Sequence, residues 1–404
     1  MPDKNGTSRR QFIKATLCSG AGLTLAGAAT EGLPPATETA AMPGRVPRRT
    51  LGATGESIPI LLLGGGAGFD VKYSNVLHRA YDEGADYVDT ALVYANGQSH
   101  RAVGSFIKQI GDRKRIWITT KGPSDGATVE SYTRDLDTCL EQMETDYADL
   151  YFMHFVDDPK YLDPEYIQMG ENLRKSKKTR FFGFSCHGSR IIEVMNKAAE
   201  AGGIDAIMFR YSFAKYGDLE LNRTIDACKK AGIGLIAMKT QNSVPDDQKH
   251  VKEFRSKDFT LHQAKLKAVW ADERIDAAVS HMDNTTKLAE NIAAAKSPAQ
   301  LSLGELNQLQ RFATASASLS CQGCSHICEP LLGGGIKVAA PLRYLMYKEC
   351  YGEAERAESL YRRLSAAQRD FERADCSAAS AACPQGIDIA RRLAEARRAL
   401  SETA

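Results

Sequence analysis

Short runs of apolar residues recur along the middle of the chain, and segments with helical periodicity separate them. At residues 74–83 and 129–143, for example, apolar positions return at the spacing of one helix face. Continuous apolar strands that alternate with such helices are typical of a parallel sheet buried on both faces. Eight units within roughly 250 residues predict an α/β fold, the closed (β/α)8 TIM barrel. The predicted strands are 60–64, 87–89, 116–120, 150–154, 181–185, 206–210, 234–238 and 277–280.

An open, doubly wound sheet is the alternative fold for this pattern. That fold normally carries a G-x-G-x-x-G sequence after its first strand, where a dinucleotide phosphate binds. Residues 64–68 are rich in glycine, but the required spacing fails at Phe69. We therefore interpret this stretch as a tight turn at the mouth of a barrel, and the barrel remains the favoured fold.

The first forty residues have the pattern of an export signal. Arg9 and Arg10, followed by Phe12 and Lys14, precede an uncharged and weakly apolar run at 15–30. A basic start and an apolar middle are typical of a signal peptide, and this run is too short to span a membrane. The paired arginines resemble the twin-arginine motif, which directs export of folded proteins. The segment 1–41 is thus predicted to be a signal peptide and linker. We expect the twin-arginine machinery to deliver the protein to the periplasm or another extracytoplasmic space, with no membrane span in the mature protein.

Composition adds one feature to this organisation. The 404 residues include 52 basic and 50 acidic side chains, so the net charge of +2 gives no electrostatic sign of nucleic-acid binding. Of the ten cysteines, six lie beyond residue 320. The sequence therefore predicts a barrel at 45–300 and a mainly helical, cysteine-bearing tail at 301–404.

Polar residues stand at the ends of three consecutive predicted strands. Asp89 and Tyr94 follow the second strand, Lys121 the third and His154 the fourth. In such barrels these strand ends meet at one rim, where catalytic groups lie. A tyrosine has a pKa of about 10, and a neighbouring lysine would lower it. The four side chains suit delivery of a proton from Tyr94 to a carbonyl oxygen while hydride attacks the carbon, with Asp89 orienting Lys121 and His154 positioning the oxygen.

The segments that carry these four residues, at 89–94, 119–121 and 149–154, resemble the catalytic segments of the aldo-keto reductases. The resemblance covers most of residues 48–295, including an opening hairpin that would plug the bottom of the barrel. It implies that Tyr94 is the general acid–base in the interconversion of a small-molecule carbonyl and an alcohol. It also implies a nicotinamide cofactor, usually NADP(H).

Cofactor contacts are likewise implied by the resemblance. Ser185 matches the residue that holds the nicotinamide carboxamide, and Tyr211 would stack on the nicotinamide ring. His281 stands where the family often has a lysine, which leaves the preference for NADP over NAD open. The residues that resemble the 2′-phosphate and adenine site are Lys287, Glu290 and Asn291.

The tail carries a cysteine motif of its own. Cys321, Cys324 and Cys328 form a C-x2-C-x3-C sequence, and Cys383 is followed by proline far downstream. Three close thiolates with a distant Cys-Pro are how ferredoxin-like clusters are ligated, although the contiguous ferredoxin run has two residues at the second spacing. We predict a 4Fe–4S cluster on these four cysteines, and some aldo-keto reductases carry a C-terminal segment that this tail resembles.

Several alternatives stay open for the tail and for the function. Cys376 or Cys350 could supply the fourth ligand, and a structural zinc or disulfides would use the same thiols. The charged helix predicted at 387–400 is ordinarily a solvated surface, and the docking of an acidic redox partner is the alternative. The main prediction is an exported reductase with NADP(H) and a cluster. The others are an oxidoreductase fed with electrons through the cluster, and a binding module with a structural metal site.

Overall fold

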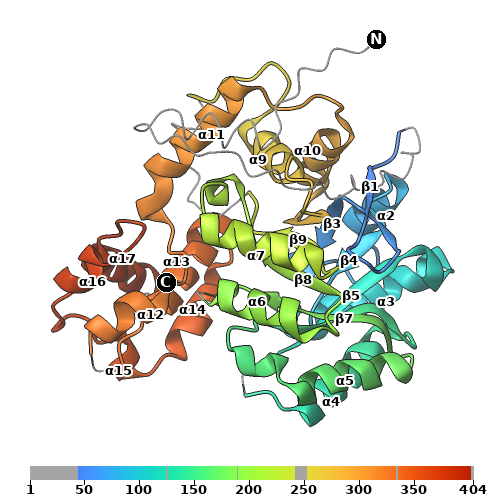
Figure 1. Cartoon of the computed structure of the whole chain (residues 1–404), viewed down its shortest axis with the longest axis horizontal. Coiled ribbons are helices and arrows are strands. Elements are labelled where there is room, and N and C mark those ends of the chain that lie inside the picture. Colours follow the sequence, from blue (N-terminus) through green and yellow to red (C-terminus); the bar gives the residue numbers. More distant parts are fainter. Residues whose placement is uncertain (1–43, 124–125, 189, 242–252, 334, 402–404) are drawn as a thin grey trace.

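The computed structural model describes residues 44–123, 126–188, 190–241, 253–333 and 335–401 (Figure 1). The predicted signal peptide, with Arg9 and Arg10, lies outside the described residues. Among the described residues, no helix combines the length and apolar character needed to cross a membrane.

Eight parallel strands close into a barrel, which confirms the predicted fold of the middle of the chain. The strands follow one another around the barrel in chain order, and the last one pairs with both the first and the seventh. They are β3 (Leu61–Gly64), β4 (Tyr87–Asp89), β5 (Trp117–Pro123), β6 (Ala148–His154), β7 (Thr179–Cys186), β8 (Ala206–Arg210), β9 (Gly234–Met238) and β10 (Ala277–His281).

Helices surround the barrel and bury one apolar face each against the strands (Figure 1). In the helix at 129–143 the Thr128 side chain accepts a hydrogen bond from the Ser131 amide, and the Ser131 side chain caps the Thr128 backbone in return. Its buried face contains Tyr132, Leu136, Cys139, Leu140 and Met143. The helices are α2 (Asn75–Asp82), α3 (Gln98–Ile110), α4 (Val129–Met143), α5 (Pro164–Lys175), α6 (Ile191–Ala201), α7 (Leu219–Lys230), α9 (Leu261–Trp270) and α10 (Thr285–Lys296).

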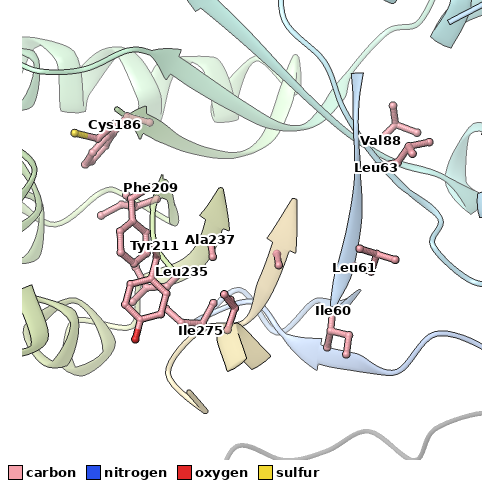
Figure 2. Close-up of a cluster of buried hydrophobic side chains, with 14 of the residues drawn as sticks. Ile60, Leu61, Leu63, Val88, Cys186, Phe209, Tyr211, Leu235, Ala237 and Ile275 are labelled. Carbon is pink, nitrogen blue, oxygen red and sulfur yellow. The ribbon is translucent and has the colours of Figure 1, made fainter. Parts of the chain in front are cut away.

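Strand side chains alternate between two apolar layers. Leu62 lies in the interior of the barrel with Tyr87 and other inward residues, whereas Leu61 and Leu63 pack in the layer between strands and helices. Figure 2 shows part of this outer layer, including Leu61, Leu63 and Val88. Both faces of each strand are therefore buried, as expected for a parallel barrel.

A hairpin of β1 (Arg48–Thr50) and β2 (Ser57–Pro59) closes the end of the barrel where the strands begin. Leu51 and Ile58 are fully buried in the interior layer. Gly52 has a φ of +50°, and a Cβ there would lie 2.3 Å from the backbone nitrogen of Gly234, at the start of β9. Only glycine allows this close approach of two backbones.

All the regular secondary structure of the described tail is helical. The first helix, α11, contributes Leu306, Leu309 and Phe312 to the outer layer of the barrel. The others enclose a separate apolar cluster that includes Leu345 and Leu393, and they lie together on one side of the barrel (Figure 1). The tail helices are α11 (Leu303–Ser316), α12 (Ser325–Cys328), α13 (Ala339–Tyr351), α14 (Ala354–Arg362), α15 (Ala366–Arg369), α16 (Ser377–Ala381) and α17 (Ile389–Ser401).

Candidate active site

The four predicted catalytic side chains meet at the end of the barrel where the strands finish. Asp89 and His154 are the last residues of β4 and β6, Lys121 lies in β5, and Tyr94 begins a short 3-10 turn, Tyr94–Gly97. The Lys121 ammonium donates hydrogen bonds to Asp89 Oδ1 at 2.5 Å and to the Thr90 carbonyl oxygen at 2.8 Å. The same ammonium lies 5.2 Å from the centre of the Tyr94 ring, and the Tyr94 and His154 rings meet edge to face at 5.8 Å.

Burial governs the protonation of these groups. It raises the pKa of Tyr94 above its usual value, the negative charge of Asp89 adds to the rise, and the positive charge of Arg356 opposes it. Burial also lowers the pKa of Lys121 and raises that of Asp89, while the attraction between the two charges opposes both shifts. It takes the pKa of His154 well below its usual range. At neutral pH, Tyr94 therefore keeps its proton and His154 is uncharged.

This protonation differs from the expectation that Lys121 lowers the pKa of Tyr94. Removal of the phenol from water outweighs the nearby cation, because a buried phenolate loses its hydration. A protonated phenol beside a neutral imidazole can donate to an oxygen atom, which is what a proton donor to a carbonyl requires.

An open cavity of about 910 Å³ lies over these residues. Side chains from strand ends and from the tail share its wall. The lining residues are Gly64, Gly66, Asp89, Tyr94, Phe155, His187, Met208, Met238, Lys239, Thr240, Gln241, Val279, Ser280, His281, Tyr347, Glu353 and Arg356.

Of the predicted cofactor residues, Ser185 and Asn291 lie just behind this cavity. Ser185 Oγ accepts a hydrogen bond from the Phe155 amide at 3.2 Å. Asn291 donates to Ser280 Oγ at 3.0 Å and accepts from the Gln241 side chain at 2.9 Å. Both residues therefore position side chains or backbone that line the cavity.

Lys287 and Glu290 lie on α10 and are held by neighbouring side chains. The Lys287 ammonium is 2.8 Å from Asp283 Oδ2, and Glu290 accepts a hydrogen bond from Thr260 Oγ1 at 2.6 Å. Neither side chain lines the cavity over Tyr94. Their predicted contacts with a 2′-phosphate and adenine stay predictions.

The structure does not bring Tyr211 to the cavity. Its ring is fully buried in the outer apolar layer beside Phe209, and its hydroxyl donates to Asp272 Oδ2 at 2.5 Å (Figure 2). The reason is the alternation of side chains along β8 and into the residue after it: Met208 points into the barrel, whereas Phe209 and Tyr211 point out. The expected stacking of Tyr211 on a nicotinamide ring is therefore inconsistent with its position.

Two aromatic rings and a lysine that were not among the predicted site residues also line the cavity. Phe155 stacks on His154 at 3.9 Å and on His187 at 4.4 Å. Phe155 and Lys239 have positive φ angles of 63° and 56°, which are uncommon for residues with a side chain. Each directly follows the last residue of a strand, β6 and β9. That position is the signal by which the sequence could have indicated them.

The tail docks on the same end of the barrel. Arg210, at the end of β8, donates a hydrogen bond to the Cys321 carbonyl oxygen at 3.4 Å. Gly323 lies against His187, whose carbonyl oxygen would be 3.9 Å from a Cβ at this glycine. The cysteine loop is thus next to residues that surround the cavity.

The four predicted cluster ligands line one small cavity in the tail. Cys321, Cys324, Cys328 and Cys383 surround an empty volume of about 300 Å³, with apolar neighbours such as Val338. All four are free thiols, and the described residues contain no group of three or more His, Cys, Asp or Glu side chains arranged to hold a metal ion. The predicted metal centre is therefore not confirmed. The alternative ligands Cys350 and Cys376 do not line this cavity.

Comparison with known proteins identifies the family to which the barrel is similar. The family model described as "Aldo/keto reductase family" matches residues 66–306. An aldo-keto reductase of Gibberella moniliformis is 29% identical over 202 residues, which cover 48% of this chain and 58% of that protein. Aldo-keto reductase YhdN of Bacillus subtilis is 31% identical over 127 residues, which cover 29% of this chain and 38% of that protein. The chain thus matches less than two thirds of the length of these relatives.

Solved structures share the fold at lower sequence identity. Aldo-keto reductase AKR11C1 from Bacillus halodurans in its holo form has a TM-score of 0.56 and 20% identity, covering 67% of this chain and 98% of its own. An aldo-keto reductase from Klebsiella pneumoniae in complex with NADPH has a TM-score of 0.53 and 21% identity, covering 67% of this chain and 96% of its own. The tail beyond residue 306 lies outside the family match.

Proposed function

The chain belongs to the aldo/keto reductase family, and we propose that it interconverts a carbonyl and an alcohol by hydride transfer with NADP(H). The convergence of Tyr94, Lys121, Asp89 and His154 beneath one cavity carries this proposal. A reductase needs a proton donor and a place for an extended nucleotide at the same rim. Tyr94 at the base of the cavity is that donor, and Lys239 and Gln241 in its wall would face a bound nucleotide.

In carbonyl reduction, bound NADPH supplies the hydride that attacks the carbonyl carbon. Tyr94 donates its phenolic proton to the carbonyl oxygen, and His154, neutral because it is buried, orients that oxygen. The Lys121 ammonium lies on the Tyr94 ring and favours the phenolate left after proton transfer. Asp89 keeps this ammonium charged and in place through the 2.5 Å contact.

The substitution Tyr94→Phe tests this assignment because it removes the transferable proton and keeps the ring. We expect turnover of an aldehyde with NADPH, followed at 340 nm, to fall by about 10²- to 10⁴-fold. Binding of NADPH, measured by fluorescence titration, should stay within a factor of two or three of the parent value. Tyr73→Phe, at an exposed tyrosine, is the matched control. Near-parental turnover by the Tyr94 variant would refute the proposed role.

The tail, in the same proposal, carries a 4Fe–4S cluster on Cys321, Cys324, Cys328 and Cys383. The support is that these thiols line a common cavity whose other walls include Leu342 and other apolar groups. Four thiolates are the usual ligands of such a cluster, and apolar walls limit its contact with solvent. The donor set therefore suits the group, which would organise the tail when bound.

Anaerobic purification with measurement of iron, sulfide and the visible absorption spectrum tests the cluster. Cys383→Ser should lose most of the iron and the brown colour, whereas Cys376→Ser should keep both, because Cys376 does not line the cavity. Full colour and iron content in Cys383→Ser would contradict this ligand set. Zinc in place of iron would support the structural-zinc alternative.

Export is the remaining part of the proposal. It rests on Arg9, Arg10 and the uncharged run that follows them. A route that carries folded proteins suits a chain that must acquire its cofactors before it crosses a membrane.

A second candidate function is reduction driven by electrons that enter through the cluster. The observation in its favour is the contact of the cysteine loop with the barrel, where Arg210 binds the Cys321 carbonyl oxygen and Gly323 lies against His187. Reduced methyl viologen supplied without NADPH decides between the two. Carbonyl reduction under those conditions would favour the second candidate, and its absence would favour NADPH as the donor.

A further inference from the structure

The tail supplies part of the wall of the cavity over Tyr94. Tyr347 from α13, Glu353 from the connection to α14, and Arg356 from α14 all line it. Arg356 stands close enough that its charge lowers the pKa of Tyr94, against the stronger effect of burial. A cation that acts on the proton donor across the cavity is in a position to act on a substrate bound there.

Arg356 is held in place by two neighbours from the tail. Its Nη1 donates to Glu353 Oε2 at 2.7 Å, and its guanidinium lies 5.0 Å from the centre of the Tyr347 ring. The side chain is nonetheless 43% exposed. A guanidinium has five N–H donors in a fixed plane and binds a carboxylate through two of them. The contact with Glu353 therefore leaves donors that can reach a ligand in the cavity.

The charged side chains that line this cavity are Asp89, Glu353, Lys239 and Arg356. Burial takes the pKa of Lys239 well below its usual value, and the positive charges of Arg210, Arg343 and Arg356 lower it further, while Glu353 opposes them. These cations are thus near enough to repel one another. Such repulsion favours binding of an anion among them.

The carboxylates at the cavity are already engaged. Asp89 contacts Lys121 at 2.5 Å, and Glu353 contacts Arg356 at 2.7 Å. The two histidines in the wall, His187 and His281, have pKa values lowered chiefly by burial, so they add no charge at neutral pH. The positive charge that reaches the cavity is therefore chiefly that of the arginines, because burial also lowers the pKa of Lys239.

We propose that Arg356 binds a carboxylate of the substrate, so that the enzyme acts on acids that carry an aldehyde or ketone group. The carbonyl would lie at Tyr94 and His154, and the carboxylate would lie at the tail side of the cavity. This inference rests on the proposed function. It makes Arg356 a specificity-determining residue that lies outside the part of the chain matched by the family.

The phosphates of the nucleotide are the other source of an anion, and matched ligands distinguish the two sources. The substrates are 4-carboxybenzaldehyde and its uncharged methyl ester, assayed with NADPH. The variants are Arg356→Gln and, as control, Arg362→Gln, at an exposed arginine that ends the same helix. NADPH affinity is measured separately by fluorescence titration for each protein.

We expect the parent protein to prefer the acid over the ester in kcat/KM by at least tenfold. Arg356→Gln should lose about 10- to 100-fold on the acid, the usual effect of losing a hydrogen bond to a charged group, and less than threefold on the ester. NADPH affinity should be unchanged, and Arg362→Gln should behave like the parent. Equal losses on acid and ester, or a parallel loss of NADPH affinity, would overturn the proposal.

A binding measurement tests the carboxylate site at Arg356 without any need for turnover. Calorimetry with the NADP⁺-loaded full chain compares 4-(hydroxymethyl)benzoate with its methyl ester. Tighter binding of the acid, lost in Arg356→Gln, supports the carboxylate site even if neither aldehyde is reduced, in which case only the proposed function fails. Equal binding of acid and ester by the parent protein overturns the inference, whatever the activity.

Discussion

The ion pair between Lys121 and Asp89 allows a prediction about stability as well as catalysis. The two side chains are only 1% and 4% exposed and meet at 2.5 Å. Asp89→Asn keeps the shape but removes the negative charge, so the ammonium stays buried with the Thr90 carbonyl oxygen as a remaining acceptor. Breaking a buried pair by removing one partner costs about 3–5 kcal/mol. We expect the free energy of unfolding to fall by that amount near neutral pH.

The loss should depend on pH with a definite sign. Burial already lowers the pKa of Lys121, and the attraction of Asp89 opposes this. Without Asp89 the pKa in the folded protein falls further below the value in the unfolded chain. The unfolded chain then binds the proton more tightly, so the variant gains stability as pH rises toward the ordinary lysine pKa of about 10.4. The deficit should therefore be largest at pH 6 and smaller at pH 9.

Urea denaturation followed by circular dichroism measures both effects. Asp137→Asn is the matched control, since Asp137 pairs with Lys178 where the side chains are 49% and 38% exposed, and such surface pairs contribute about 0–1 kcal/mol. Replacing both buried partners, in Asp89→Asn with Lys121→Met, should recover much of the loss. A loss in Asp89→Asn no larger than that of the control, at every pH, would refute the reasoning.

Three further outcomes are expected. Gly52→Ala should destabilise the protein by about 2–4 kcal/mol, since it adds strain at positive φ and a clash with the β9 backbone, whereas Gly55→Ala, at positive φ in open space, should cost about 1 kcal/mol in thermal denaturation. Cys383→Ser should expose new protease sites in the tail with the barrel still protected, as shown by mass spectrometry of limited digests. Replacing Arg9 and Arg10 by Lys should leave the loaded protein in the cytoplasm in cell fractionation; its recovery from the exported compartment would contradict the twin-arginine assignment.

Most of the barrel could be predicted from the sequence because its strands are short and mostly apolar. Predicted and observed strands agree to within a few residues, as at 150–154 against Ala148–His154. Burial of both strand faces is also the reason why the position of Tyr211 could not be predicted. Where both faces of a strand are buried, apolar and polar residues do not alternate, so the sequence does not show which side chains point inward. The sequence therefore did not show that Tyr211, predicted to stack on the nicotinamide ring, belongs to the outer layer.

The protonation of the site could not be predicted from strand ends alone. The sequence placed Lys121 beside Tyr94, and the structure brings them together, with the ammonium 5.2 Å from the ring centre. The sequence did not show how deeply Tyr94 is buried. Burial changes the pKa of this phenol more than any single charge does. Long-range contacts create that burial, and they depend on the folding of the whole chain.

The contribution of the tail to the site was missed for a related reason. The sequence pattern predicted the barrel at 45–300 and the cysteine-bearing tail at 301–404 as separate units. The structure instead places Tyr347, Glu353 and Arg356 over Tyr94, and all three act electrostatically on the phenol. Loosening the tail would remove the opposing cation of Arg356 and admit water to the cavity, two changes that shift the pKa of Tyr94 in opposite directions. Any group that orders the tail at Cys321 would thereby tune the proton donor in the barrel, so the two parts of the chain form one site.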